Sequence, residues 1–187
     1  SGSVPGLMTA GVLDPHEYYY RRLFVDAVRL AEAAAGHERV AADRLFVTGG
    51  SQGGAMALAV AGLARHRGVQ IAGCAADVPF LCHFSRAIGL TAAYPYQEVV
   101  DYLATYPMRV RQVMTTLSYF DGMSMAARAT AAGLFSVGLM DEIAPPSTVY
   151  AAYHHYAGEK RIEVYPYNGH EGGGSYQLER IHHWLAE

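Results

Sequence analysis

Short apolar runs alternate along the chain with longer segments of helical periodicity. Four of these runs lack regular polar positions, a pattern that favours strands buried on both faces. Strands that are separated by helices predict an α/β fold, in which helices cover both faces of a mostly parallel sheet. The predicted strands span residues 44–48, 69–76, 134–137 and 161–165.

An amphipathic helix is predicted before the first of these strands, because apolar residues recur there with i, i+3, i+4 spacing. Asp14, Pro15 and Glu17 match the N-cap, first and N3 positions of a capping box, so we expect the helix to start there. It should end near Gly36, since glycine commonly follows the last turn. Further helices are predicted over residues 55–61, 95–103, 147–157 and 175–186.

The turn between the first strand and the next helix has the sequence Gly49-Gly50-Ser51-Gln52-Gly53-Gly54. Gly-x-Ser-x-Gly between a strand and a helix is the pattern of a nucleophile elbow, which holds a serine hydroxyl above the sheet. Glycine suits the flanking positions because such a turn leaves little room for side chains and can require a positive φ. The alternative is an ordinary glycine-rich turn with an incidental serine. The elements on both sides favour the elbow.

A serine nucleophile needs a base, and His170 fits this role best. It follows the last predicted strand in a glycine-rich loop, which would let its ring reach back over the sheet. Most of the other histidines lie on or near predicted helices, where exposure to solvent is the simpler explanation. No cysteine or carboxylate stands beside them at a spacing that favours a metal site.

Three acids compete to orient the ring of His170. Asp141 follows the third predicted strand and gives the chain order Ser, Asp, His that is typical of this arrangement. Asp77 follows the second predicted strand, where it could cap a turn or serve as the acid in a variant layout. Asp121 precedes Gly122 in a pair typical of turns. Chain order and position favour Asp141, which would stabilise the protonated ring without taking its proton.

An oxyanion forms when the serine attacks a carbonyl, and two hydrogen-bond donors are expected to stabilise it. The backbone N–H of Gln52 is expected to be the first donor, because it follows the nucleophile. The second donor normally comes from a loop after an early strand, and we find no candidate for that loop. Since the first predicted strand already carries the serine, we expect earlier strands of the sheet to be missing from this chain.

Composition narrows the possible partners. The 187 residues are expected to form a single domain, with a helical insertion over about residues 77–130. The net charge is -3 and no basic stripe is present, so we expect no nucleic-acid partner. No apolar stretch approaches the ~20 residues of a membrane span, and the start of the chain does not resemble a signal peptide.

The cysteines and the absence of metal-site patterns bear on location and cofactors. Cys74 and Cys82 stand among apolar residues, where a thiol is usually a small inert hydrophobe. Two isolated cysteines give little support for a disulfide. We therefore expect a cytoplasmic protein that uses neither a metal nor a cofactor.

Several segments resemble carbohydrate esterase family seven, the acetyl xylan esterases and cephalosporin C deacetylases. Gly-x-Ser-x-Gly alone is shared by most α/β-hydrolases, so the likeness rests on segments spread over the whole chain. The most specific are Asp77-Val78-Pro79-Phe80-Leu81-Cys82 and His170-Glu171. The segments span residues 5–9, 11–15, 18–22, 49–54, 77–84, 117–122, 136–141 and 170–173.

The resemblance implies an α/β-hydrolase fold and a serine deacetylase of small acetylated sugars, with Ser51, Asp141 and His170 as its triad. It implies a hexamer whose active sites face an internal cavity, and it makes Pro79 and Phe80 candidates for lining the acyl and sugar pocket. Another acyl hydrolase on this fold, such as a thioesterase or a peptidase, is the alternative enzyme. A chain of low activity that serves mainly in oligomer assembly is the alternative outside catalysis.

Two departures from the family pattern concern the start of the chain. The family's Arg-Gly-Gln motif, and the tyrosine whose backbone donates to the oxyanion, belong to a region that this sequence lacks. Ala10 also stands where relatives usually carry arginine. We therefore expect the chain to be the C-terminal part of a longer enzyme, or one of two pieces that works with a separate N-terminal segment.

Overall fold

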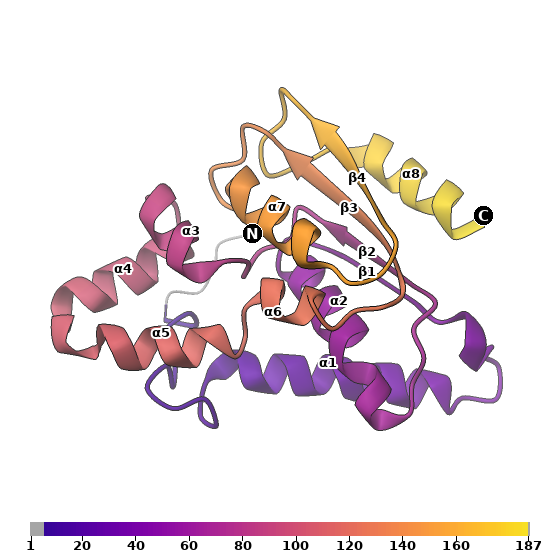
Figure 1. Cartoon of the computed structure of the whole chain (residues 1–187), viewed down its shortest axis with the longest axis horizontal. Coiled ribbons are helices and arrows are strands. Elements are labelled where there is room, and N and C mark those ends of the chain that lie inside the picture. The colour runs from indigo at the N-terminus through magenta and orange to yellow at the C-terminus, as the bar shows by residue number, and fades with distance from the viewer. Residues whose placement is uncertain (1–5, 187) are drawn as a thin grey trace.

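A parallel sheet forms the centre of the molecule (Figure 1). The computed structural model describes residues 6–186, and the expectations that concern Ser1–Pro5 lie outside the described residues. The strand order is β1-β2-β3-β4, and every neighbouring pair is parallel. This confirms the predicted α/β sheet. The strands are β1 (Phe46–Gly50), β2 (Gly73–Asp77), β3 (Ala132–Gly138) and β4 (Lys160–Tyr165).

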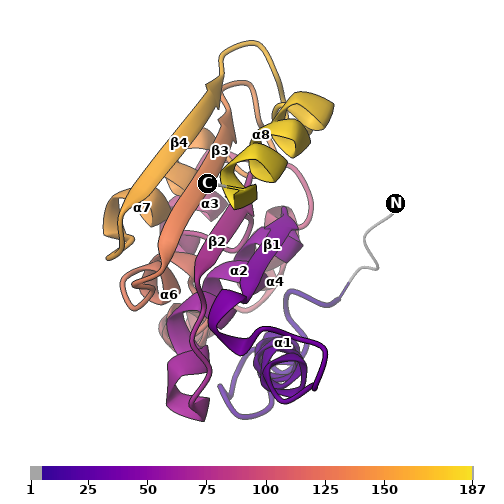
Figure 2. The same ribbon diagram turned by 90° about the vertical axis from the view of Figure 1, so that its right-hand side faces the viewer.

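Helices cover both faces of the sheet, as Figure 2 shows. Side chains alternate between the two faces along each strand, and both sets on the central strands are apolar except for Asp77 and Ser136 toward their carboxyl ends. Ala75 and Leu134 form a buried cluster with Ile181 of α8 on one face. Cys74 and Phe135 belong to the main core on the other face. The helices outside the insertion are α1 (Tyr19–Ala35), α2 (Gln52–Leu63), α7 (Pro146–His155) and α8 (Gly174–Ala186).

The chain between β2 and β3 is helical and lies to one side of the sheet (Figure 1). A short helix within it begins at a buried carboxylate, because the Asp121 side chain accepts a hydrogen bond from the backbone N–H of Met123. The helices are α3 (Phe84–Leu90), α4 (Tyr96–Thr105), α5 (Val110–Ser118) and α6 (Gly122–Ala126). Short 3₁₀ turns occur at η1 (Ala42–Arg44), η2 (Ala64–Arg67) and η3 (Pro107–Arg109).

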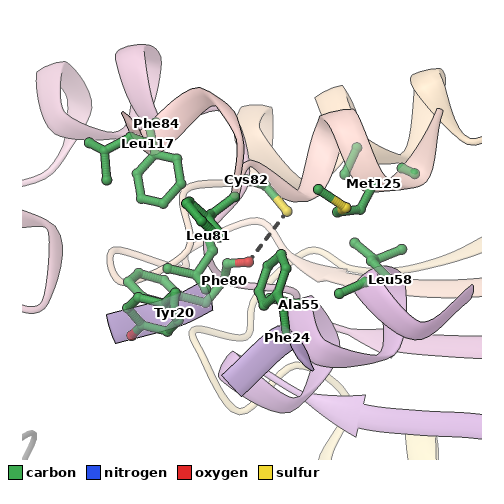
Figure 3. Close-up of a cluster of buried hydrophobic side chains, with 14 of the residues drawn as sticks. Tyr20, Phe24, Ala55, Leu58, Phe80, Leu81, Cys82, Phe84, Leu117 and Met125 are labelled. Atoms are coloured by element: carbon green, nitrogen blue, oxygen red, sulfur yellow. Dashed lines mark hydrogen bonds between the residues drawn. The ribbon is translucent and has the colours of Figure 1, made fainter. Parts of the chain in front are cut away.

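The loop after β2 enters the main hydrophobic core and ties this insertion to the sheet. Figure 3 shows Phe80, Leu81 and Cys82 packed between side chains of α1 and α2 and those of α3, α5 and α6. Each of the three is at most 2% exposed. The loop is therefore anchored by apolar burial on both sides, and its start lies beside the turn after β1.

The predicted starts of the first helix and of the second strand are wrong. The expected capping box does not form: α1 begins at Tyr19, and the Asp14 carboxylate instead accepts a hydrogen bond from the N–H of His16 in a turn before it. The second strand begins at Gly73 rather than at Val69, because the N–H of Val69 donates to the preceding 3₁₀ turn. The predicted end of α1 is confirmed, since Gly36 is its C-cap.

Candidate active site

Ser51 lies in the turn between β1 and α2, and its backbone has a conformation that residues other than glycine rarely adopt. Its φ is 55° and its ψ is -116°. Its N–H donates to the carbonyl oxygen of Asp77 at 2.9 Å, and its carbonyl accepts from the N–H of Phe80 at 3.0 Å. Such strain persists only where the surrounding structure holds it. Here the loop after β2 holds it, and the serine is presented at the carboxyl end of the sheet.

The glycines around Ser51 serve close packing between β1, α2 and the loop after β2. A Cβ at Gly49 would lie 2.4 Å from the carbonyl carbon and oxygen of Gly53. A Cβ at Gly54 would lie 3.0 Å from the Cα of Pro79. The positive φ of the turn falls on the serine itself and not on these glycines, which corrects one part of the sequence argument.

His170 lies between Ser51 and Asp141. Its Nε2 is 2.7 Å from the Oγ of Ser51, and its Nδ1 is 2.8 Å from the Oδ2 of Asp141. An ionised carboxylate can only accept, so Nδ1 carries the proton and Nε2 is free to accept from the serine hydroxyl. The His170 side chain is 24% exposed, which leaves its outer edge accessible to a substrate.

Asp141 is a buried and fully partnered carboxylate. Its side chain has no exposed surface. Its Oδ1 accepts hydrogen bonds from the N–H groups of Ile143 at 2.8 Å and Ala144 at 2.9 Å, and its Oδ2 faces His170. These donors compensate for the loss of water around the charge. They also fix the plane of the carboxylate toward the ring.

The loops that carry Asp141 and His170 are joined at the ends of β3 and β4. The N–H of Met140 donates to the carbonyl of Asn168 at 3.0 Å. A Cβ at Gly138 would lie 2.2 Å from the carbonyl oxygen of Gly169, so the strand end passes directly against the histidine loop. The distance between the acid and the histidine is therefore set by backbone contacts.

The two other acids considered from the sequence have different surroundings. Asp121 accepts hydrogen bonds from the N–H groups of His83 at 2.8 Å and Phe84 at 3.0 Å. Burial raises its pKa above 3.8 more strongly than these donors lower it. Asp77 is paired with the hydroxyl of Ser136, and burial raises its pKa as well. Neither carboxylate has a hydrogen bond to His170 among the contacts of the described residues.

Gln52, Pro79 and Phe80 lie around the serine in different ways. Gln52 is the first residue of α2, and the first N–H groups of a helix have no acceptor within it. Pro79 is buried, and the ring of Phe80 packs against Tyr96 with 4.4 Å between centroids. The assignment of Pro79 and Phe80 to a substrate pocket stays a prediction.

The loop after β2 contains a feature that sequence reasoning missed. Val78, Leu81 and His83 have positive φ angles of 36°, 58° and 50°. Val78 and Leu81 are residue types that rarely adopt such a conformation, and a lone histidine such as His83 is too weak a signal to predict it. Ser136 on β3 was missed too, because a serine inside an apolar strand has no motif around it.

The part of the chain that the structure describes contains neither a candidate metal site nor a candidate membrane-spanning helix. Between residues 6 and 186, no three His, Cys, Asp or Glu side chains come together as a metal site would require. Over the same range, no helix has both the length and the apolar character needed to cross a membrane.

Comparison with known proteins places the chain in a family. The family model described as acetyl xylan esterase (AXE1) matches residues 1–187. The chain belongs to the acetyl xylan esterase family. A solved acetyl xylan esterase from Paenibacillus sp. R4 is 41% identical, with a TM-score of 0.91 over 100% of this chain. Acetyl xylan esterase 1 from Thermoanaerobacterium sp. JW/SL YS485 is 33% identical, with a TM-score of 0.88 over 100% of this chain.

The chain corresponds to only part of these acetyl xylan esterases. It covers 58% of the Paenibacillus chain and 59% of the Thermoanaerobacterium chain. The acetyl esterase Axe7A of Xylanibacter ruminicola is 29% identical over 166 residues, which are 88% of this chain and 36% of that protein. The resemblance inferred from the motifs is thereby confirmed, and so is the α/β-hydrolase fold.

Proposed function

We propose that the chain is a serine esterase that removes acetyl groups from xylo-oligosaccharides and related small acetyl esters, including cephalosporin C. The hydrogen-bonded series Ser51–His170–Asp141 carries this proposal, because it joins a nucleophile to a base and the base to an orienting carboxylate. The names of the two solved relatives, both acetyl xylan esterases, support acetyl as the acyl group.

The proposed reaction has two halves. Ser51 Oγ attacks the acetyl carbonyl carbon while its proton passes to Nε2 of His170, and Asp141 stabilises the resulting imidazolium. The bond to the sugar oxygen then breaks, that oxygen takes the proton, and the acetyl group remains on Ser51. Water attacks this ester and gives a proton to His170. Acetate leaves, and the proton returns to the serine oxygen.

The backbone N–H of Gln52 is the proposed oxyanion donor. It lies at the amino end of α2, where the aligned peptide dipoles also favour negative charge. Removing one of two oxyanion donors typically lowers kcat by ~10²–10³. The turnover rate of this chain by itself therefore measures whether a second donor is available to it.

A direct test is the reaction with p-nitrophenyl acetate. We expect a pre-steady-state burst of p-nitrophenol, because acylation of Ser51 precedes hydrolysis of the acyl-enzyme. Ser51→Ala should abolish the burst, whereas Ser85→Ala should not, since Ser85 is an exposed serine on α3. Full turnover by Ser51→Ala would refute the proposal.

Acyl-chain length distinguishes an acetyl esterase from the alternative acyl hydrolases. We expect rates to fall from acetyl to butyryl to longer p-nitrophenyl esters, and acetate to be released from acetylated xylo-oligosaccharides. A preference for long acyl chains would favour a thioesterase-like activity, and cleavage of aminoacyl amides would favour a peptidase.

The assembly is also a proposal. A hexamer would restrict entry to short oligosaccharides if its active sites faced an enclosed space. Sedimentation equilibrium of the chain tests this state directly. An assembled but inactive chain would favour the alternative in which it serves mainly in oligomer assembly. The cytoplasmic location stays a prediction.

A further inference from the structure

Asp77 lies at the carboxyl end of β2, next to the turn that carries Ser51. The strand register places it between Gly50 of β1 and Ser136 of β3. Its backbone carbonyl accepts the N–H of Ser51, so the residue already holds the serine turn in place. Its side chain has no part in the mechanism proposed above.

The hydrogen bonds around Ser136 have a defined direction. The N–H of Val78 donates to the Oγ of Ser136 at 3.1 Å, and a backbone N–H can only donate. The Ser136 hydroxyl then directs its own proton to Oδ1 of Asp77. Ser136 is fully buried. This series therefore delivers one hydrogen bond to the Asp77 carboxylate, as suits its ionised form.

The histidine loop passes over this pair at Gly172. A Cβ at Gly172 would lie 3.4 Å from Oδ1 of Asp77 and 3.5 Å from Oγ of Ser136, so the loop backbone packs against both side chains. Gly172 has a φ of 54°, which glycine adopts without strain. Asp77 thus lies beneath the loop that carries His170.

The next residue of the loop, Gly173, is also held by close packing. The ring of Tyr165 packs so closely on Gly173 that a Cβ there would lie 2.0 Å from Cζ of the ring. The Tyr165 hydroxyl donates to Oε1 of Gln177 at 2.8 Å, and Gln177 is buried on α8. The loop therefore has little freedom to move away from Asp77.

We propose that Asp77 is a positioning residue of this site, whose carboxylate, held by Ser136 beneath the histidine loop, supplies a second negative charge that favours the imidazolium form of His170. The proposal rests on the function proposed above, because it assigns His170 the role of base. Asp141 orients the ring by direct contact, whereas Asp77 acts through the field of its charge and through the loop.

Titratable groups on the histidine loop, β4 and α8 interact with Asp77, with His170 or with their neighbours. Burial raises the pKa of Asp77 above 3.8, whereas the hydrogen bond from Ser136 lowers it and the charge of His170 lowers it to a smaller extent. Burial raises the pKa of the Tyr165 hydroxyl on β4, the charges of Glu163 and then Asp77 raise it further, and Arg180 lowers it. Glu171 accepts hydrogen bonds from the side-chain amide of Asn168 and from the N–H of Gly169, and it is a further negative charge that interacts with His170.

The test is a titration of the His170 ring by NMR, which needs neither substrate nor turnover. The ring signal is assigned by its loss in His170→Gln. Asp77→Asn keeps the size of the side chain and removes the charge, and Asp26→Asn on the exposed face of α1 is the matched control. Asp77→Asn should lower the titration midpoint by about half a pH unit, roughly a threefold loss of proton affinity.

The result that overturns the proposal is a midpoint that is the same in Asp77→Asn as in the parent chain and in Asp26→Asn. Ser136→Ala provides a second variant in case Asp77→Asn does not fold. It should lower the midpoint by a smaller amount, and the double variant should shift no further than Asp77→Asn. Additive shifts would show that Ser136 does not act through Asp77, and would contradict the proposed relay.

The pH dependence of kcat/KM for p-nitrophenyl acetate gives a second readout. Its acid limb should move to lower pH in Asp77→Asn, whereas a purely structural defect would lower the plateau without moving the limb. If the proposed esterase function is wrong, the Ser51→Ala variant will still hydrolyse p-nitrophenyl acetate. That failure is distinguishable, because the NMR midpoint reports on Asp77 whether or not the chain turns over.

Discussion

Replacement of Gly49 by alanine should damage the serine turn more than any neighbouring glycine-to-alanine change of similar size. The Cβ would lie 2.4 Å from the carbonyl carbon and oxygen of Gly53 and 2.8 Å from its Cα. All three are backbone atoms of α2, so no flexible side chain can move to make room. Relief requires β1 and the first turn of α2 to separate, which displaces Ser51 between them.

Gly53→Ala is the matched control, because a Cβ at Gly53 meets no atom within 4 Å. Overpacking that forces backbone shifts costs about 1–3 kcal/mol, whereas a glycine-to-alanine change without strain stabilises by about 0.4–1 kcal/mol. The free energies of unfolding of the two variants should therefore differ by about 1.5–4 kcal/mol.

Urea unfolding followed by circular dichroism measures this difference, and labelling of Ser51 by a fluorophosphonate measures its effect on the site. A misplacement of about 1 Å can cost 10²-fold in rate, so labelling of Gly49→Ala should be slowed far more than that of Gly53→Ala. Equal stability and equal labelling of the two variants would refute the packing argument.

Three further predictions follow from strain and burial. Ser51→Gly should be more stable than Ser51→Ala by about 1 kcal/mol in thermal or urea unfolding, because only glycine adopts the φ of 55° without strain; equal stabilities would contradict this. Burial raises the pKa of the Cys74 thiol to about 12, so Cys74 and the buried Cys82 should resist Ellman's reagent at pH 8 until the chain unfolds. Because burial raises the pKa of Asp121, its contribution to stability is greatest below pH 3.8 and falls as pH rises through the raised value. Asp121→Asn should therefore lose less stability at pH 7 than at pH 4 in urea unfolding, and the opposite trend would contradict the assignment.

Much of the fold could be predicted from local patterns. The four strands were found because each is a short apolar run between helical segments, and the helix end at Gly36 was found from its glycine. The start of α1 was not found, because Asp14 satisfies a turn before the helix with the same side chain that would have capped it. A capping sequence alone does not distinguish these two uses.

The residues of the candidate site were likewise predicted only in part. Ser51, Asp141 and His170 could be selected from motif, chain order and strand ends, and the structure places them within hydrogen-bond distance in series. The pair of Asp77 and Ser136 could not be selected, because its members are 59 residues apart and meet only through strand register. Side chains that meet through register leave no spacing signal in the sequence.

Ser51 is expected to carry the acetyl group during turnover. Mass spectrometry of the chain, quenched in acid within the burst of p-nitrophenyl acetate hydrolysis and then digested, tests it most directly. We expect one added acetyl group on the peptide that contains Ser51, and none on the same peptide of Ser51→Ala. Hydrolysis without an acetylated Ser51 peptide, or an equal acetyl adduct on the Ser51→Ala peptide, would contradict it.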